Sequence, residues 1–161
     1  MVDGRFGVLV GRGGSGTTLL PSLPTDVPMT LYVALKNPAP GDRVNVVGTG
    51  SASAVLSTGS TTSGADWFTL AMDTNGTANV ASTPAAPRGS IILCATRTQY
   101  SFAVQTPTTY KGGGVTSWPK NTPLTKVEAL PSVVHWELWY GASHGPDVRA
   151  GIMARLQGLL A

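Results

Sequence analysis

The first pattern that could carry chemistry is a glycine-rich segment near the N-terminus. Residues 11–16 read Gly-Arg-Gly-Gly-Ser-Gly, the spacing of a dinucleotide-binding loop. Such a loop needs a helix N-terminus behind it, where backbone N–H groups hold phosphate. Pro21, Pro24 and Pro28 prevent a helix of useful length, and Thr17 stands where a phosphate loop would carry lysine. We therefore expect no nucleotide and no other cofactor.

A second pattern joins Ser143, His144 and Asp147, which in principle could supply the nucleophile, base and acid of a hydrolase. Ser143 is not part of a Gly-x-Ser-x-Gly elbow, and adjacency in the sequence does not create the geometry of a triad. The segment is typical of a turn before a helix, with the Ser143 hydroxyl and the His144 imidazole in solvent. No catalytic residue is assigned, and we expect no enzyme.

His135 and Glu137 alternate on one predicted strand and share a face. They could form a pH-sensitive pair or two ligands of a metal ion. A third ligand at suitable spacing is missing from the sequence, so a solvated pair is the simpler interpretation and no metal is expected. Cys94 is the single cysteine and lies in an apolar run, which indicates a small buried hydrophobic residue.

Aromatic side chains are the remaining candidates for binding. Trp136 and Tyr140 alternate on the face expected to pack, so the core accounts for them. Trp118, Trp139 and Tyr110 are less constrained, and exposed rings of this kind stack on the apolar faces of sugars. These three residues are our candidate ligand or receptor contacts.

Composition narrows the classes of function. The 161 residues include only 11 Lys and Arg, 8 Asp and Glu, 2 His and 1 Cys. Because the basic residues are scattered, nucleic acid is not an expected partner. The length favours a single domain over residues 1–161. Apolar runs fall short of the ~20 residues that span a bilayer, and no secretion signal begins the chain, so we expect a soluble, unsecreted protein or an excised piece of a longer one.

The elements that must position these residues are short strands. Apolar runs rich in Val, Thr and aromatic residues alternate with clusters of Gly, Pro and Asn, which is typical of antiparallel β-structure. We expect strands near Arg5–Val10, Met29–Lys36, Arg43–Val47, Trp67–Met72, Thr77–Ala81, Ser90–Thr96, Tyr100–Gln105 and Val133–Tyr140. The sequence therefore predicts an all-β protein, an antiparallel β-sandwich of jelly-roll type.

Turns and loops separate these strands. Asn75-Gly76 lies between two apolar runs and predicts a tight hairpin, because both residues tolerate positive φ. Residues 48–65 are polar and weakly charged, which indicates a flexible loop or an edge strand around Val55 and Leu56. Residues 110–131 also resemble a loop, and long loops on a rigid β-frame often carry recognition.

A short amphipathic helix is predicted over residues 146–161. Pro146 suits the first helical position, and Asp147 places a negative charge in the first turn. Four apolar residues recur on one face and form a candidate assembly surface, namely Val148, Ile152, Leu156 and Leu159. We expect this face to pack on the sandwich or on a neighbouring subunit, with a membrane surface as the weaker alternative.

The overall composition combines few charges, many prolines and long Ser/Thr/Gly/Ala-rich segments with a predicted sandwich. In this overall composition the chain resembles the jelly-roll coat domains and protruding surface domains of small non-enveloped viruses, and less specifically phage decoration proteins. The resemblance implies a virion structural protein that associates with itself and with other virion subunits and presents loops to a host receptor or glycan. An Arg-rich N-terminal arm is missing, which favours a projecting capsid-surface domain over a genome-packaging shell.

The competing class is a carbohydrate-binding module. Such a module works as a monomer and needs two or three coplanar exposed rings, for which Trp118, Trp139 and Tyr110 are available. A coat domain instead needs an apolar subunit contact of about 800 Å² per partner. Self-association and glycan binding therefore distinguish the two classes.

Overall fold

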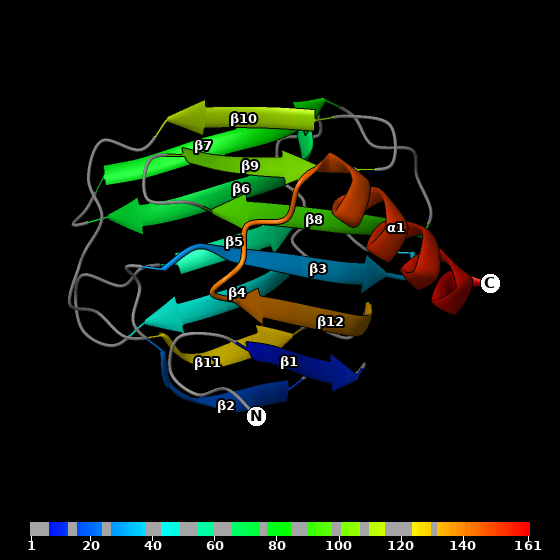
Figure 1. Ribbon diagram of the computed structural model, residues 1–161, viewed down its shortest axis with the longest axis horizontal. Helices are drawn as coiled ribbons and strands as arrows, with labels where there is room; N and C mark the ends of the chain where they lie inside the picture. The colour runs from blue at the N-terminus through cyan, green and yellow to red at the C-terminus, as the bar shows by residue number, and fades with distance from the viewer. Residues whose placement is uncertain are drawn as a thin grey trace.

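The computed structural model describes residues 7–12, 16–23, 27–37, 43–48, 55–59, 66–74, 77–84, 90–97, 101–106, 110–114, 124–129 and 132–161. Within these residues, twelve strands form two six-stranded sheets that stack as layers, and one helix crosses the outer face of the front sheet (Figure 1). All neighbouring strands are antiparallel. The predicted antiparallel β-sandwich with a short C-terminal helix is confirmed.

The front sheet, sheet A, has the strand order β1-β12-β3-β8-β9-β10. Its strands are β1 (Gly7–Arg12), β3 (Met29–Leu35), β8 (Ile91–Arg97), β9 (Ser101–Gln105), β10 (Tyr110–Gly114) and β12 (Val133–Tyr140). Sheet B has the order β2-β11-β4-β5-β6-β7. Its strands are β2 (Gly16–Leu23), β4 (Arg43–Gly48), β5 (Val55–Gly59), β6 (Asp66–Thr74), β7 (Thr77–Pro84) and β11 (Leu124–Ala129).

Strand β3 shows how the sandwich is held together. All seven residues of β3 are buried, which explains why the sequence Met-Thr-Leu-Tyr-Val-Ala-Leu is almost continuously apolar. Tyr32 and Ala34 pack under the C-terminal helix, whereas Leu31 and Val33 alternate to the other face of the strand, between the two sheets. One strand therefore contributes to two apolar layers. Cys94 lies in the layer beneath the helix and is buried, as predicted.

Four strands were not predicted as they occur. β10 and β11 lie in the segment predicted as a loop, and β2 covers residues for which only a helix had been excluded and no strand was predicted. Pro21 is compatible with β2 because β2 is an edge strand, where one face of the backbone needs no partner. The possible strand around Val55 is β5, but it lies between β4 and β6 and is not an edge.

The Asn-Gly hairpin is confirmed by strand pairing. β6 and β7 pair antiparallel with Thr74 opposite Thr77, which leaves two residues for the turn. Those two residues, Asn75 and Gly76, lie outside the described residues, as does Trp118. Asn37, which follows β3, has φ of 46°, in the left-handed region that asparagine tolerates.

Helix α1 (Pro146–Gln157) continues into a short 3-10 turn, η1 (Gly158–Leu160). Among the described residues, no helix is long and apolar enough to cross a membrane. The face that α1 and η1 bury against sheet A is formed by Met153, Leu156 and Leu160, with Ile152 partly buried at its edge.

The predicted apolar face of the helix needs correction. Leu156 is buried as expected, but Val148 and Leu159 are about half exposed, at 50% and 51%. The buried face is rotated toward Met153 and Arg149. The polar Arg149 is tolerated there because its guanidinium finds partners at the strand ends.

Gly11 lies opposite Trp136 in the β1–β12 pair, and this close approach accounts for the glycine. A Cβ atom at Gly11 would lie 2.1 Å from the indole Nε1 of Trp136, far inside van der Waals contact. We expect Gly11→Ala to lower the free energy of unfolding by about 1–3 kcal/mol, because the buried indole must move. Urea denaturation measures this loss.

Gly16→Ala is the matched control for this prediction. Gly16 belongs to the same glycine-rich motif and begins β2, but nothing lies within 4 Å of its added Cβ atom. Equal stability of the two variants would contradict the packing role assigned to Gly11.

Candidate ligand-binding face

The outer face of sheet A carries a set of interacting polar side chains around the start and the end of α1. The chain leaves β12 through Gly141, whose φ of 82° requires glycine and whose N–H donates to the Pro28 carbonyl at 2.8 Å. Thr30 then fixes the turn: its hydroxyl donates to the Ala142 carbonyl at 3.0 Å and accepts from the His144 backbone N–H at 3.1 Å. These bonds place His144 over the end of β3.

His144 is packed against two aromatic rings. The Trp139 ring meets the imidazole edge-on at 4.8 Å between centroids, and the Tyr32 hydroxyl lies 2.7 Å from Nδ1. Burial and the nearby Arg149 charge lower the pKa of His144, while burial raises the pKa of Tyr32. The Tyr32 hydroxyl and the imidazole Nδ1 therefore form a short, partly buried hydrogen bond. The predicted solvent-exposed imidazole is wrong, because the turn folds His144 inward.

Ser143 and Asp147 do not complete a catalytic group. Both are exposed, whereas His144 has its Nδ1 bonded to Tyr32. In a triad the acid holds one ring nitrogen of the histidine and the nucleophile meets the other, whereas here Tyr32 occupies Nδ1 in place of Asp147. The three residues that form the sequence pattern are therefore not assembled as a triad.

Arg149 connects the start of α1 to the neighbouring strands. Its Nε donates to Oε1 of Gln105 at 2.6 Å, and its Nη1 donates to the His144 carbonyl at 2.6 Å. Its guanidinium also lies 5.4 Å from the ring centroid of Tyr110, within cation–π range. Tyr110 is 60% exposed and stands opposite Gln105 in the β9–β10 pair.

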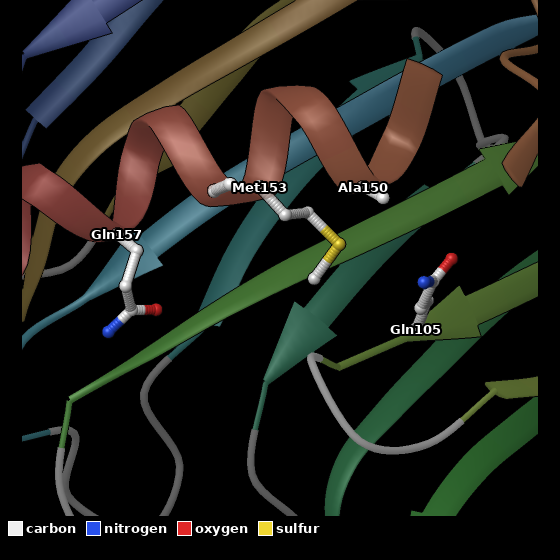
Figure 2. Close-up of a pocket in the computed structure, with 5 residues that line it drawn as sticks. Gln105, Ala150, Met153 and Gln157 are labelled. Carbon is white, nitrogen blue, oxygen red and sulfur yellow. The ribbon is translucent and has the colours of Figure 1, made fainter. Parts of the chain in front are cut away.

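A groove of about 240 Å³ runs beside α1 on this side. We call it the Gln105 groove; it is lined by Gln105, Ala150, Met153, Ala154 and Gln157. Figure 2 shows Met153 projecting from the helix between the two glutamines, with Gln105 rising from β9. The groove thus combines an apolar floor with amide groups at both ends.

Glu137 organises the opposite side of the helix. It is only 3% exposed, yet it is bonded to three side chains. The indole N–H of Trp139 donates to Oε2 at 3.1 Å, Arg155 Nη2 donates to Oε1 and Oε2 at 2.7 and 2.8 Å, and His135 Nε2 lies 3.0 Å from Oε1. The predicted solvated His135–Glu137 pair is wrong, because the helix and Arg155 cover it.

The charge state of Glu137 follows from these contacts. Burial alone would raise the pKa of Glu137, but the bonds from His135, Arg155 and Trp139 together lower it below its ordinary value. Glu137 is therefore ionised at neutral pH. The described residues contain no group of three or more His, Cys, Asp or Glu side chains placed to hold a metal ion.

A second groove, of about 390 Å³, lies beside this cluster. We call it the Arg12 groove; it is lined by Arg12, Val134, His135, Arg155 and Leu159. Arg12 stands opposite His135 in the β1–β12 pair, so both side chains project from the same face of sheet A. The two grooves therefore flank the same helix.

Two of the predicted aromatic ligand contacts, Trp139 and Tyr110, lie far apart on sheet A. Tyr110 is on β10 and Trp139 is on β12, four strand positions apart in sheet A. Strands lie 4.7–4.9 Å apart, so about 19 Å separates the two positions, with α1 crossing the sheet between β12 and β9. They cannot form one coplanar platform. Trp139 is also half-buried with its N–H bonded to Glu137, which leaves Tyr110 as the more accessible ring.

The sequence alone did not identify Gln105, Arg149 or Arg155. Each gains its role from a partner far along the chain, as in the Arg149–Gln105 bond across 44 residues. The only local signal was that Arg149 and Arg155 are the two basic residues of the helix.

No known protein family and no curated protein matches the sequence. Among solved structures, the chain is similar to the botulinum neurotoxin serotype C1 binding domain, with a TM-score of 0.59 and 7% identity over 96% of this chain. It is similar to the CBM40 module of the Ruminococcus gnavus IT-sialidase bound to α2,3-sialyllactose, with a TM-score of 0.53 and 9% identity over 90%. It is also similar to tailspike protein 2 of the Escherichia coli O157:H7 bacteriophage CAB120, with a TM-score of 0.55 and 12% identity over 88% of this chain.

These likenesses concern the fold. The chain spans 48% of the toxin domain and 23% of the tailspike, but 97% of the CBM40 module. The neighbours are β-sandwich domains, two of them named for binding and one from a phage particle. The resemblance to virus proteins is therefore supported in part, without any matching motif.

Proposed function

We propose that this protein is a glycan-binding attachment domain on the surface of a virus particle, and that it is not an enzyme. The observation that carries the proposal is the exposed Tyr110 ring beside Arg149 and Gln105, next to the Gln105 groove. An aromatic ring, an amide and a guanidinium at one place offer stacking and hydrogen bonds to the same ligand. Sugars need this combination because their rings have both hydroxyl and C–H surfaces.

The dimensions of the groove support a small ligand unit. Its volume of about 240 Å³ falls below the ~300–1,000 Å³ usual for drug-sized ligands, which suits one sugar ring. Met153 offers an apolar floor, while Gln105 and Gln157 supply amide donors and acceptors. Further sugar units would extend toward Tyr110.

The structural neighbours support the same class. The CBM40 module was solved with sialyllactose, and the tailspike belongs to a bacteriophage. A domain that combines glycan binding with a place on a phage particle would be attached to the virion and bind a host glycan. Self-association on the particle is part of this proposal, and the half-exposed Val148 of α1 and Leu159 of η1 are the residues available for it.

A glycan array followed by calorimetry on the best glycan tests the proposal. We expect Tyr110→Ala to weaken binding about tenfold, since losing a stacked ring costs about 1 kcal/mol or more. Tyr110→Phe keeps the ring and should retain most of the affinity. The bound glycan should be recovered uncleaved after long incubation.

Leu19→Ala is the control for a general surface effect. Leu19 is 81% exposed, but it lies on β2 of sheet B, away from the groove. Failure to bind any glycan, or equal binding by Tyr110→Ala and the unmodified protein, would refute the proposed site. Cleavage of the glycan would refute the non-enzymatic role.

A further inference from the structure

The Arg12 groove has a composition that the Gln105 groove lacks. Two arginines and a histidine line it, together with the apolar Val134 and Leu159. No acidic residue is among its lining residues. We propose that the Arg12 groove is a second binding site, which takes the carboxylate of an acidic sugar.

Arg155 is held in place before any ligand arrives. Its Nη2 bonds both carboxylate oxygens of Glu137, and the buried Glu137 is fixed in turn by Trp139. These bonds use Nη2 alone, so Nε and Nη1 can donate to a ligand. Arg155 remains 56% exposed, which gives a ligand access to those donors. A guanidinium fixed in this way loses less side-chain entropy on binding.

Arg12 provides the second positive charge. It is exposed at the end of β1 and forms no ion pair with any of the described residues. Glu137 offsets one of the two arginine charges, so Arg12, Arg155 and Glu137 together leave a net charge of one. The outward carbonyls at the C-terminal end of α1 do not attract anions, so the arginines must supply the attraction. One net positive charge suits a single carboxylate.

The apolar residues decide the class of ligand. Leu159 is 51% exposed at the edge of the groove, and Val134 is partly buried beside it. An inorganic anion would gain nothing from these side chains. An acidic sugar presents a planar carboxylate, which matches the fork of an arginine, and a C–H face, which matches the apolar wall.

Titration with galacturonate tests the site, with galactose as the matched neutral sugar and sulfate as the simple anion. We expect the indole N–H signal of Trp139, which is bonded to Glu137, to shift with galacturonate, with little response to galactose and weaker binding at higher salt. Arg12→Ala should weaken galacturonate binding at least tenfold without changing the thermal transition. Arg155→Lys keeps a charge next to Glu137 but loses the fork, and it should weaken binding similarly.

Three outcomes would overturn the inference: unchanged galacturonate binding by Arg12→Ala, equal binding of galactose and galacturonate, or sulfate binding as tight as galacturonate. The Tyr110→Ala variant separates this site from the Gln105 groove. It should bind galacturonate normally, because Tyr110 lies on the other side of α1. The two sites can therefore fail independently.

Discussion

Leu156→Ala is expected to lower the free energy of unfolding by about 2–5 kcal/mol and to loosen the C-terminal helix from sheet A. Leu156 is fully buried in the cluster that joins α1 to Tyr32, Ala34 and Ile92. Removing its side chain leaves a cavity in the contact that holds the helix. Thermal or urea denaturation gives the size of the loss.

Cys94 provides a direct readout of helix docking. It is the only cysteine, it lies beneath the helix in the same cluster, and burial raises its pKa to about 12. A thiol reagent should therefore react very slowly with the folded protein. We expect Leu156→Ala to increase the labelling rate under native conditions, because helix opening exposes the thiol.

Leu159→Ala is the matched control, in the 3-10 turn η1 that directly continues α1. Leu159 is half exposed, so its truncation should change the free energy of unfolding by less than about 0.5 kcal/mol and leave Cys94 protected. Equal effects of the two variants would contradict the observed docking face. Light scattering of Leu159→Ala also tests self-association. A smaller particle or oligomer than that of the unmodified protein supports the proposed assembly role of Leu159, and an unchanged monomer opposes it.

The sequence predicted the class of fold because alternation and turn residues are local signals. β12 and the β6–β7 hairpin follow from side-chain alternation and from Asn-Gly, and both are present. The strands that escaped prediction, such as β10 with Tyr-Lys-Gly-Gly-Gly, have almost no apolar pattern. Pairing with β9 stabilises β10 through backbone bonds that do not depend on its side chains.

The candidate sites were less predictable because they depend on contacts across the sheet. Glu137 was expected in solvent since one face of β12 looked polar, but α1 returns over that face and Arg155 neutralises it. The predicted buried face of α1 was also wrong because the prediction did not include contacts with distant residues. A helical wheel treats Arg149 as outward, whereas Gln105 and the His144 carbonyl give it partners inside.

Glu137→Ala should lower the free energy of unfolding by about 3 kcal/mol. The substitution leaves the indole N–H of Trp139 without its acceptor and removes the anchor of Arg155. The loss falls near the lower end of the range for broken buried ion pairs, because the exposed Arg155 can return to water. Glu128→Ala is the control, since Glu128 forms an exposed pair with Lys126 and should change stability by less than about 1 kcal/mol.

The same carboxylate predicts the acid sensitivity of the fold. The folded pKa of Glu137 lies below its ordinary value of 4.5, so folding is favoured by its ionised form. Its contribution is complete above about pH 4.5 and is lost as the pH falls through the folded pKa, because the unfolded chain binds the proton first. Glu137→Gln should therefore be less stable than the unmodified protein at pH 7 but lose less stability on acidification. Denaturation curves at several values between pH 7 and pH 3 measure both slopes. Parallel slopes would show that Glu137 does not link the helix to pH, and the anchoring of Arg155 would then have to rest on packing alone.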